Sequence, residues 1–220
     1  TPTTPTTPTT PTTPTTSSAE LFSCQSTGPP PKGVCLFDVD GTISTTKHVD
    51  AVLDECLKRG FAVGIATAGG YTISKLCPVD RPEHFPYRWM TLKFCENIEQ
   101  CKTFNAVGSN KFLMNDQLNS SARYQEGLKG RPSKASGPGW RKGFALHTAV
   151  QDLKVEEPCG ILFDDDPKYL SGAQAYIEAH SLPFATACAK ARKCGGADVP
   201  DSLTPSYVGD AVDRSIGLCT

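Results

Sequence analysis

Acidic residues follow two of the apolar segments in this sequence. Asp38 and Asp40 come directly after the apolar run 33–37, and Asp164 and Asp165 end a later run of the same kind. If both runs are parallel strands, their carboxyl ends meet at one edge of a sheet, where open α/β folds bind ligands. Carboxylates brought so close repel one another unless a hard cation lies between them, and all-oxygen ligand sets suit Mg2+. The pattern therefore predicts a magnesium site that uses these four aspartates, although Asp40 alone is equally typical of a turn or helix cap.

The elements that must position these residues alternate between strands and helices. Short, continuously apolar runs predict strands buried on both faces, at 33–37, 61–66, 160–163 and 183–187. Apolar residues at helical spacing predict helices, at 49–57, 146–153 and 169–177. This alternation predicts an α/β fold, a three-layer α/β/α Rossmann-like parallel sheet. Thr67 ends the second run and should reach the same sheet edge as Asp38.

Residues 71–140 lack this regularity and are predicted to form a small, cap-like insertion within a domain that spans 33–220. They mix aromatic residues and cysteines with a Gly/Ser/Lys-rich stretch near 127–139, which we interpret as a mobile loop.

A threonine and proline repeat fills residues 1–16, with proline at every third position. This period matches the polyproline II helix, which has no apolar face to bury. We therefore predict that residues 1–32 form an extended linker or a stalk with O-glycans on Thr1–Thr16.

The chain contains ten cysteines, an even number that suits disulfides such as Cys95–Cys101 or Cys188–Cys194. Together with the repeat, they favour an extracellular or secreted protein. The alternative is buried free thiols, for which the apolar positions of Cys35 and Cys56 are suitable, and a cytoplasmic location.

Charge and hydropathy exclude some classes of partner. The net charge is −1 and the basic residues are scattered, so binding to nucleic acid is not expected. No apolar run approaches the roughly 18 residues that a membrane-spanning helix needs, so no membrane span is expected.

The segment Asp38-Val39-Asp40-Gly41-Thr42, after an apolar run, resembles the DxDGT signature of the haloacid dehalogenase (HAD) superfamily. Other signatures of that family follow in order: a threonine at the end of the second strand, a lysine before the later strand, and an acidic pair. In this sequence they are Thr67, Lys142 and Asp164-Asp165. The resemblance covers approximately residues 33–188.

The resemblance implies a phosphatase that works through an aspartyl-phosphate intermediate. Asp38 would be the nucleophile, Asp40 the general acid and base, and Thr67 and Lys142 the groups that bind the phosphoryl oxygens. Lys134 and Arg141 lie near Lys142 and are alternatives to it.

The resemblance also implies Mg2+ as the cofactor. Its ligands would be Asp38, Asp165 and the backbone carbonyl of Asp40, with Asp164 a further ligand or a residue beside them. The stretch between Asp38 and Thr67 is too short for a cap domain, so residues 71–140 would supply any lid.

The identity of the phosphorylated substrate stays open. A phosphotransferase or a polynucleotide end phosphatase would use the same first step. A different class is a structural or binding domain of an extracellular, O-glycosylated and disulfide-containing glycoprotein or fibre, in which the HAD-like fold is a rigid spacer.

Overall fold

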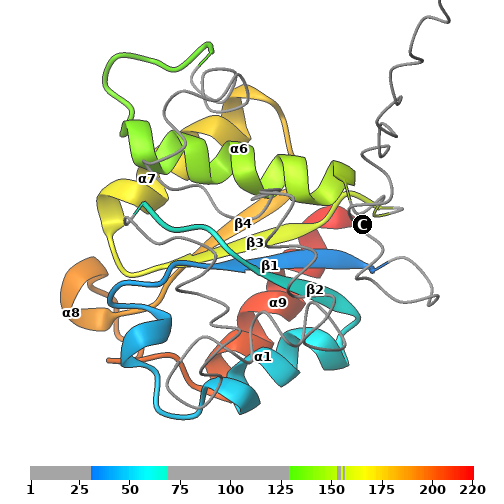
Figure 1. The fold of residues 1–220 in the computed structure, drawn as a ribbon, viewed down its shortest axis with the longest axis vertical. Helices are drawn as coiled ribbons and strands as arrows, with labels where there is room; N and C mark the ends of the chain where they lie inside the picture. Colours follow the sequence, from blue (N-terminus) through cyan, green and yellow to red (C-terminus); the bar gives the residue numbers. More distant parts are fainter. Residues whose placement is uncertain (1–30, 69–128, 153–154, 156) are drawn as a thin grey trace, which may run out of the picture.

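The computed structural model describes residues 31–68, 129–152, 155 and 157–220 (Figure 1). Its elements are β1 (Gly33–Phe37), the 3-10 helix η2 (Ile43–Thr45), α1 (Val49–Lys58), β2 (Phe61–Ile65), α6 (Gly137–Asp152), β3 (Gly160–Asp164), α7 (Pro167–Ala179), β4 (Phe184–Cys188), α8 (Ala191–Cys194) and α9 (Pro205–Cys219). The Thr/Pro repeat, the pair Cys95–Cys101 and most of the predicted insertion lie outside the described residues.

The four described strands form one parallel sheet in the order β2-β1-β3-β4. Strand β1 is central, with Phe37 paired in register to Ile65 of β2 and to Phe163 of β3. Every residue of β1, β2 and β3 is buried, as their continuously apolar sequences predict. The predicted α/β fold with a parallel sheet is confirmed.

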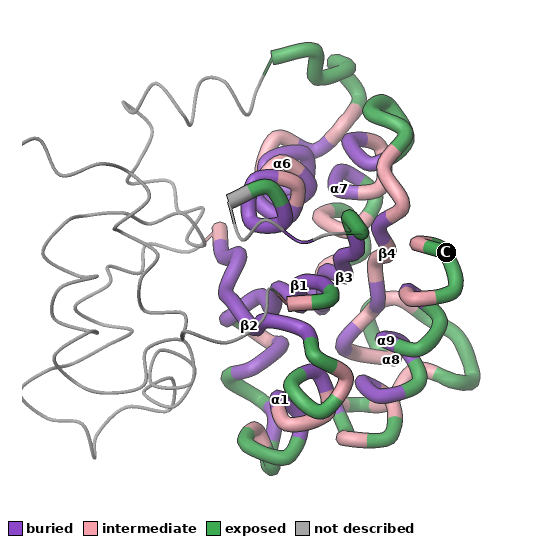
Figure 2. The backbone as a smooth tube through the Cα atoms, turned by 90° about the vertical axis from the view of Figure 1, so that its right-hand side faces the viewer, coloured by how far each residue is buried: buried purple, intermediate pink, exposed green. Residues whose placement is uncertain are grey.

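Helices cover both faces of the sheet (Figure 1). Strand residues alternate between the faces, so Phe37 and Phe163 point to one side, where their rings stack 4.7 Å apart in a core shared with α1 and α9. Leu36 and Leu162 point to the other side and pack against α6 and α7. The result is three layers with buried strands at the centre (Figure 2).

The amino-terminal turn of α6 corrects the prediction for the Gly/Ser/Lys-rich stretch. We expected a loop up to Gly139, but α6 begins at Gly137, and Trp140 is fully buried. Gly139 faces Gly172 of α7 so closely that a Cβ on Gly139 would lie 2.9 Å from the Gly172 Cα. Gly139 and Gly172 lack a side chain and so allow the backbones of α6 and α7 to come into contact. In the sequence alone, such glycines are more typical of a loop.

Helices α8 and α9 were not predicted. Helix α9 begins after Thr204, whose Oγ1 accepts a hydrogen bond from the Tyr207 N–H, and Pro205 occupies its first turn. Its buried residues Val208, Ala211 and Val212 complete the core beside α1.

Within the described residues, four cysteines lie at disulfide distance in pairs. Cys188–Cys194 is one of the pairs that the sequence suggested, and Cys159–Cys219, which ties the start of β3 to the end of α9, is an additional one. Cys35 and Cys56 are free and buried. None of the helices in the described part of the chain is both long and apolar enough to cross a membrane.

Candidate functional site

Two aspartates meet where β1 and β3 end. Asp38 immediately follows β1, its N–H donates a hydrogen bond to the Phe163 carbonyl, and Asp164 is the last residue of β3. Because Phe37 and Phe163 are in register, the next residues along the two strands are neighbours. Both are buried. They meet because the carboxyl ends of parallel strands lie at the same edge of the sheet.

Lys142 of α6 joins the two carboxylates. Its side chain is only 1% exposed, and its Nζ donates hydrogen bonds to Asp38 Oδ1, at 2.7 Å, and to Asp164 Oδ2. The same ammonium lies 4.9 Å from the centre of the Tyr169 ring. Of the basic residues considered from the sequence, Lys142 is thus brought to the acidic residues, whereas Lys134 is exposed.

The pKa values of this group reflect burial and mutual interaction. Burial raises the pKa of Asp38 to about 7; the charge of Lys142 opposes this shift and that of Asp164 adds to it. Burial likewise raises the pKa of Asp164, against the charge of Lys142. Burial works to lower the pKa of Lys142, but Asp38 and Asp164 outweigh it, so that this pKa lies above its ordinary value.

Asp165 completes the cluster and packs against Gly41. Gly41 has φ +78°, and a Cβ at this position would overlap the Asp165 carboxylate. A glycine is therefore required here for two reasons: the left-handed backbone and the space taken by Asp165. This contact brings the turn after β1 against the residue that follows β3.

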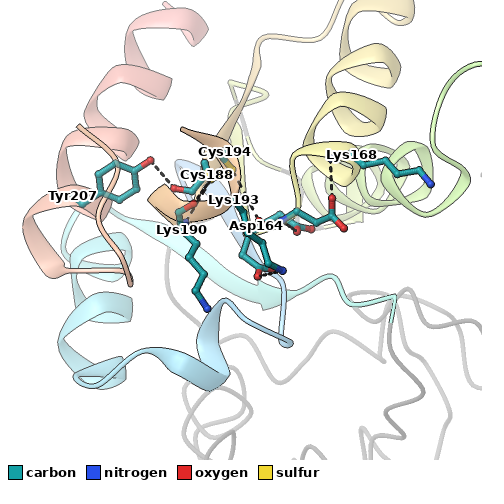
Figure 3. Close-up of a disulfide and its surroundings, with 9 residues drawn as sticks. Asp164, Lys168, Cys188, Lys190, Lys193, Cys194 and Tyr207 are labelled. Carbon is teal, nitrogen blue, oxygen red and sulfur yellow. Dashed lines mark hydrogen bonds and ion pairs between the residues drawn. A yellow bond between two sulfur atoms is a disulfide. The ribbon is translucent and has the colours of Figure 1, made fainter. Parts of the chain in front are cut away.

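Lys193, which the sequence did not single out, is a second ammonium at the site. Its Nζ lies 2.6 Å from Asp165 Oδ2, as an ion pair. The contact with Asp165 raises the pKa of Lys193. Lys193 belongs to α8, which the Cys188–Cys194 pair holds beside the end of β4 (Figure 3). No local sequence pattern reveals this contact, because it depends on the path of the chain between Cys188 and Cys194.

Thr67 and Asp40, the other two predicted site residues, differ from each other in burial, and neither belongs to the carboxylate cluster. Thr67 is fully buried two residues after β2, and the hydrogen bond from the Ala66 N–H to the Phe37 carbonyl keeps its segment beside Asp38. The Asp40 side chain is exposed in the turn after Asp38 and does not belong to the group of clustered carboxylates. The expectation that Asp40 shares the metal site therefore applies at most to its backbone.

The donor set fits a hard divalent cation. Asp38, Asp164 and Asp165 each offer a carboxylate oxygen, and these oxygens lie within 4.8 Å of one another. Asp165 Oδ2 is buried, and the Lys193 ammonium lies 2.6 Å from it. Three buried carboxylates whose oxygens lie this close together form the all-oxygen ligand set that Mg2+ prefers.

The arrangement places three carboxylates that could hold a cation beside the buried Lys142 ammonium, at one edge of the sheet. No family model, curated protein or solved structure matches this chain.

Proposed function

We propose that this protein is a Mg2+-dependent phosphatase of the haloacid dehalogenase type, which forms an aspartyl-phosphate on Asp38. The observation that carries the proposal is the buried Lys142 bonded to both Asp38 and Asp164, next to a third carboxylate. A core of purely structural residues has no physical reason to bury three carboxylates and a lysine together, since each buried charge costs free energy.

Asp38, Asp164 and Asp165 would hold the cation, and Mg2+ would supply positive charge to the phosphoryl oxygens. Lys142 would supply a second positive charge beside Asp38. Because Lys142 is held by two hydrogen bonds, this charge is already in place before substrate binds, which is the condition for effective electrostatic stabilisation.

The steps on this chain's residues follow from nucleophilic catalysis. An Asp38 carboxylate oxygen forms a bond to phosphorus as the ester oxygen leaves, and the leaving oxygen takes a proton from the Asp40 carboxyl. Water then attacks the acyl phosphate, Asp40 takes its proton, and inorganic phosphate leaves with Asp38 restored. Asp40 lies in the turn after Asp38, two residues from the nucleophile.

The test is phosphate release from a small aryl phosphate by the full chain, with Mg2+ and then with excess chelator. We expect the activity to require Mg2+, and the Asp38→Asn variant to lose at least about 10³-fold in kcat/KM. Asp210→Asn, an exposed carboxylate on α9, is the matched control and should keep wild-type activity. A folded wild-type protein without activity, or an Asp38→Asn variant as active as wild type, would sink the proposal.

A second proposal concerns the setting in which the protein works. The two cysteine pairs at disulfide distance support an oxidising, extracellular environment. Mass spectrometry of alkylated, unreduced protein should show these four cysteines protected and Cys35 and Cys56 reduced. Alkylation of all six in the native isolate after unfolding would argue for a reducing compartment instead. A folded, disulfide-bonded but inert protein would favour the structural glycoprotein.

A further inference from the structure

Lys193 places a positive charge where the proposed cation would bind. Its Nζ lies 2.6 Å from an oxygen of Asp165, one of the three clustered carboxylates. The Asp165 side chain is 3% exposed and that of Lys193 is 50% exposed, so the ammonium reaches the carboxylate from the solvent side. A Mg2+ ion on the same carboxylate, at about 2.1 Å, would lie within a few ångströms of the ammonium and repel it.

The Lys193 contact differs from that of Lys142 in ways that favour exchange. Lys142 is buried and donates two hydrogen bonds, to two carboxylates, whereas Lys193 is half exposed and pairs with one carboxylate, that of Asp165. A half-exposed lysine has a long, flexible side chain that can move into solvent at little cost. Asp165, by contrast, is buried, and its carboxylate lies against Gly41.

The backbone around Lys193 is anchored close to Asp165. Cys194, the next residue, pairs with Cys188 at the end of β4 (Figure 3). Ala189 in turn donates its N–H to the Asp164 carbonyl, and the Tyr207 hydroxyl donates to the Cys188 carbonyl. The segment is thus anchored to the sheet, and only the side chain of Lys193 needs to move when a cation arrives.

We propose that Lys193 exchanges with the divalent cation at Asp165, so that it neutralises this carboxylate in the cation-free protein and releases it when the cation binds. The residue thereby lowers the affinity of the site and sets the cation concentration at which the site fills. This inference rests on the proposed function only in taking the carboxylate cluster as a divalent-cation site.

The test is the binding of Mn2+ alone to the full chain. The electron paramagnetic resonance signal of the free ion measures this binding. Removing the competing charge in Lys193→Met should tighten binding about fivefold, the effect of roughly one ion pair. Lys193→Arg keeps the charge and should stay near wild type. Arg192→Met removes the same charge from the adjacent residue, which is 80% exposed and paired with Asp201, and should change affinity less than about twofold.

A double-mutant cycle separates exchange from a general effect of charge or folding. In an Asp165→Asn background, Lys193→Met should no longer tighten Mn2+ binding, because the shared carboxylate is gone. Equal or weaker Mn2+ binding by Lys193→Met in the wild-type background would overturn the inference. It would mean that Lys193 does not compete with the cation, or that it holds Asp165 in place for it. Absence of Mn2+ binding in every variant would overturn it too.

The readout does not involve phosphate release, so the two proposals can fail separately. If the protein releases no phosphate but the Mn2+ affinities of the variants follow the expected order, the exchange proposal stands and the phosphatase proposal fails. If the protein is an active, Mg2+-dependent phosphatase but Lys193→Met binds Mn2+ no more tightly than wild type, the phosphatase proposal stands and the exchange proposal fails.

Discussion

Lys142 is the residue whose environment is most costly to disturb. An ammonium that is 1% exposed depends on Asp38 and Asp164 for its stability, and they depend on it. Removing one member of such a group leaves uncompensated buried charge, whereas removing an exposed charge changes little. The energetics of the site can therefore be tested without any substrate.

We expect Lys142→Met to lower the free energy of unfolding by about 3 kcal/mol in the absence of divalent cations, because two buried carboxylates lose their partner. Urea denaturation measures this change. Lys168→Met, an exposed lysine at the start of α7, is the control and should stay within about 0.5 kcal/mol of wild type. A Lys142→Met variant as stable as wild type would mean that the carboxylates are neutral in the folded protein.

His147 of α6 makes a pH-dependent contribution to stability. Its ring contacts Tyr176 of α7 and His180, the residue that follows α7, with Nδ1 3.1 Å from the Tyr176 hydroxyl. Burial, and after it the charge of His180, lowers the pKa of His147 in the folded protein. The unfolded chain therefore binds the proton more tightly, so this contribution to stability is complete above the unfolded pKa of about 6.5 and is lost as the pH falls through the lower, folded pKa.

The thermal unfolding midpoint, measured at pH 7.5 and at pH 5.5, should accordingly fall less in His147→Gln than in wild type. Glutamine keeps a hydrogen-bonding group but does not titrate, so the difference between the two proteins isolates this histidine. His48→Gln, at an exposed position before α1, should behave as wild type does. A wild-type midpoint that falls no further than that of His147→Gln would contradict the assignment.

Sequence reasoning located Asp38, Asp164, Asp165 and Lys142, which the structure brings together. The three aspartates could be found because strand ends of a parallel sheet converge, a rule that needs only strand positions. Lys142 came from the family resemblance, since a single lysine carries no signal of its own. Lys193 could not be found, because its contact depends on the closure of the segment between Cys188 and Cys194.

Among the elements, the three strands that are buried throughout were the most predictable. Their continuous apolar runs are incompatible with a solvent-facing surface. Helix α9 was missed although its signals are present: Thr204-Pro205 at the start, then Val208, Ala211 and Val212 at helical spacing. The start of α6 was missed for a different reason, because Gly137 and Gly139 are typical of loops unless another helix packs directly on them.

The cap of α9 gives a prediction at the scale of one element. Thr204→Ala removes the acceptor of the Tyr207 N–H and should lower the free energy of unfolding by about 1 kcal/mol. Thr204→Ser keeps a hydroxyl and should restore most of this loss. Guanidinium denaturation of both variants makes the comparison, and equal stability of Thr204→Ala and wild type would show that the cap contributes nothing.

At the scale of the whole molecule, the two cysteine pairs constrain chain segments of very different length. Cys159 and Cys219 are 60 residues apart and link β3 to α9 across the core, whereas Cys188 and Cys194 are 6 residues apart within one local segment. A disulfide stabilises mainly by restricting the unfolded chain, and the restriction grows with the logarithm of the enclosed length. The long link should therefore matter more for stability, while the short one mainly positions Lys193.

Replacing both cysteines of a pair by alanine separates these two contributions. We expect the Cys159/Cys219 double variant to lose about 4 kcal/mol of unfolding free energy and the Cys188/Cys194 double variant about 2 kcal/mol, from the entropy of loop closure. Urea denaturation under non-reducing conditions measures both. The Mn2+ affinity should change in the second variant and not in the first, because only the second frees the backbone on which Lys193 is carried. The reverse order of stabilities would show that the local segment, and not the link between β3 and α9, determines the stability of the domain.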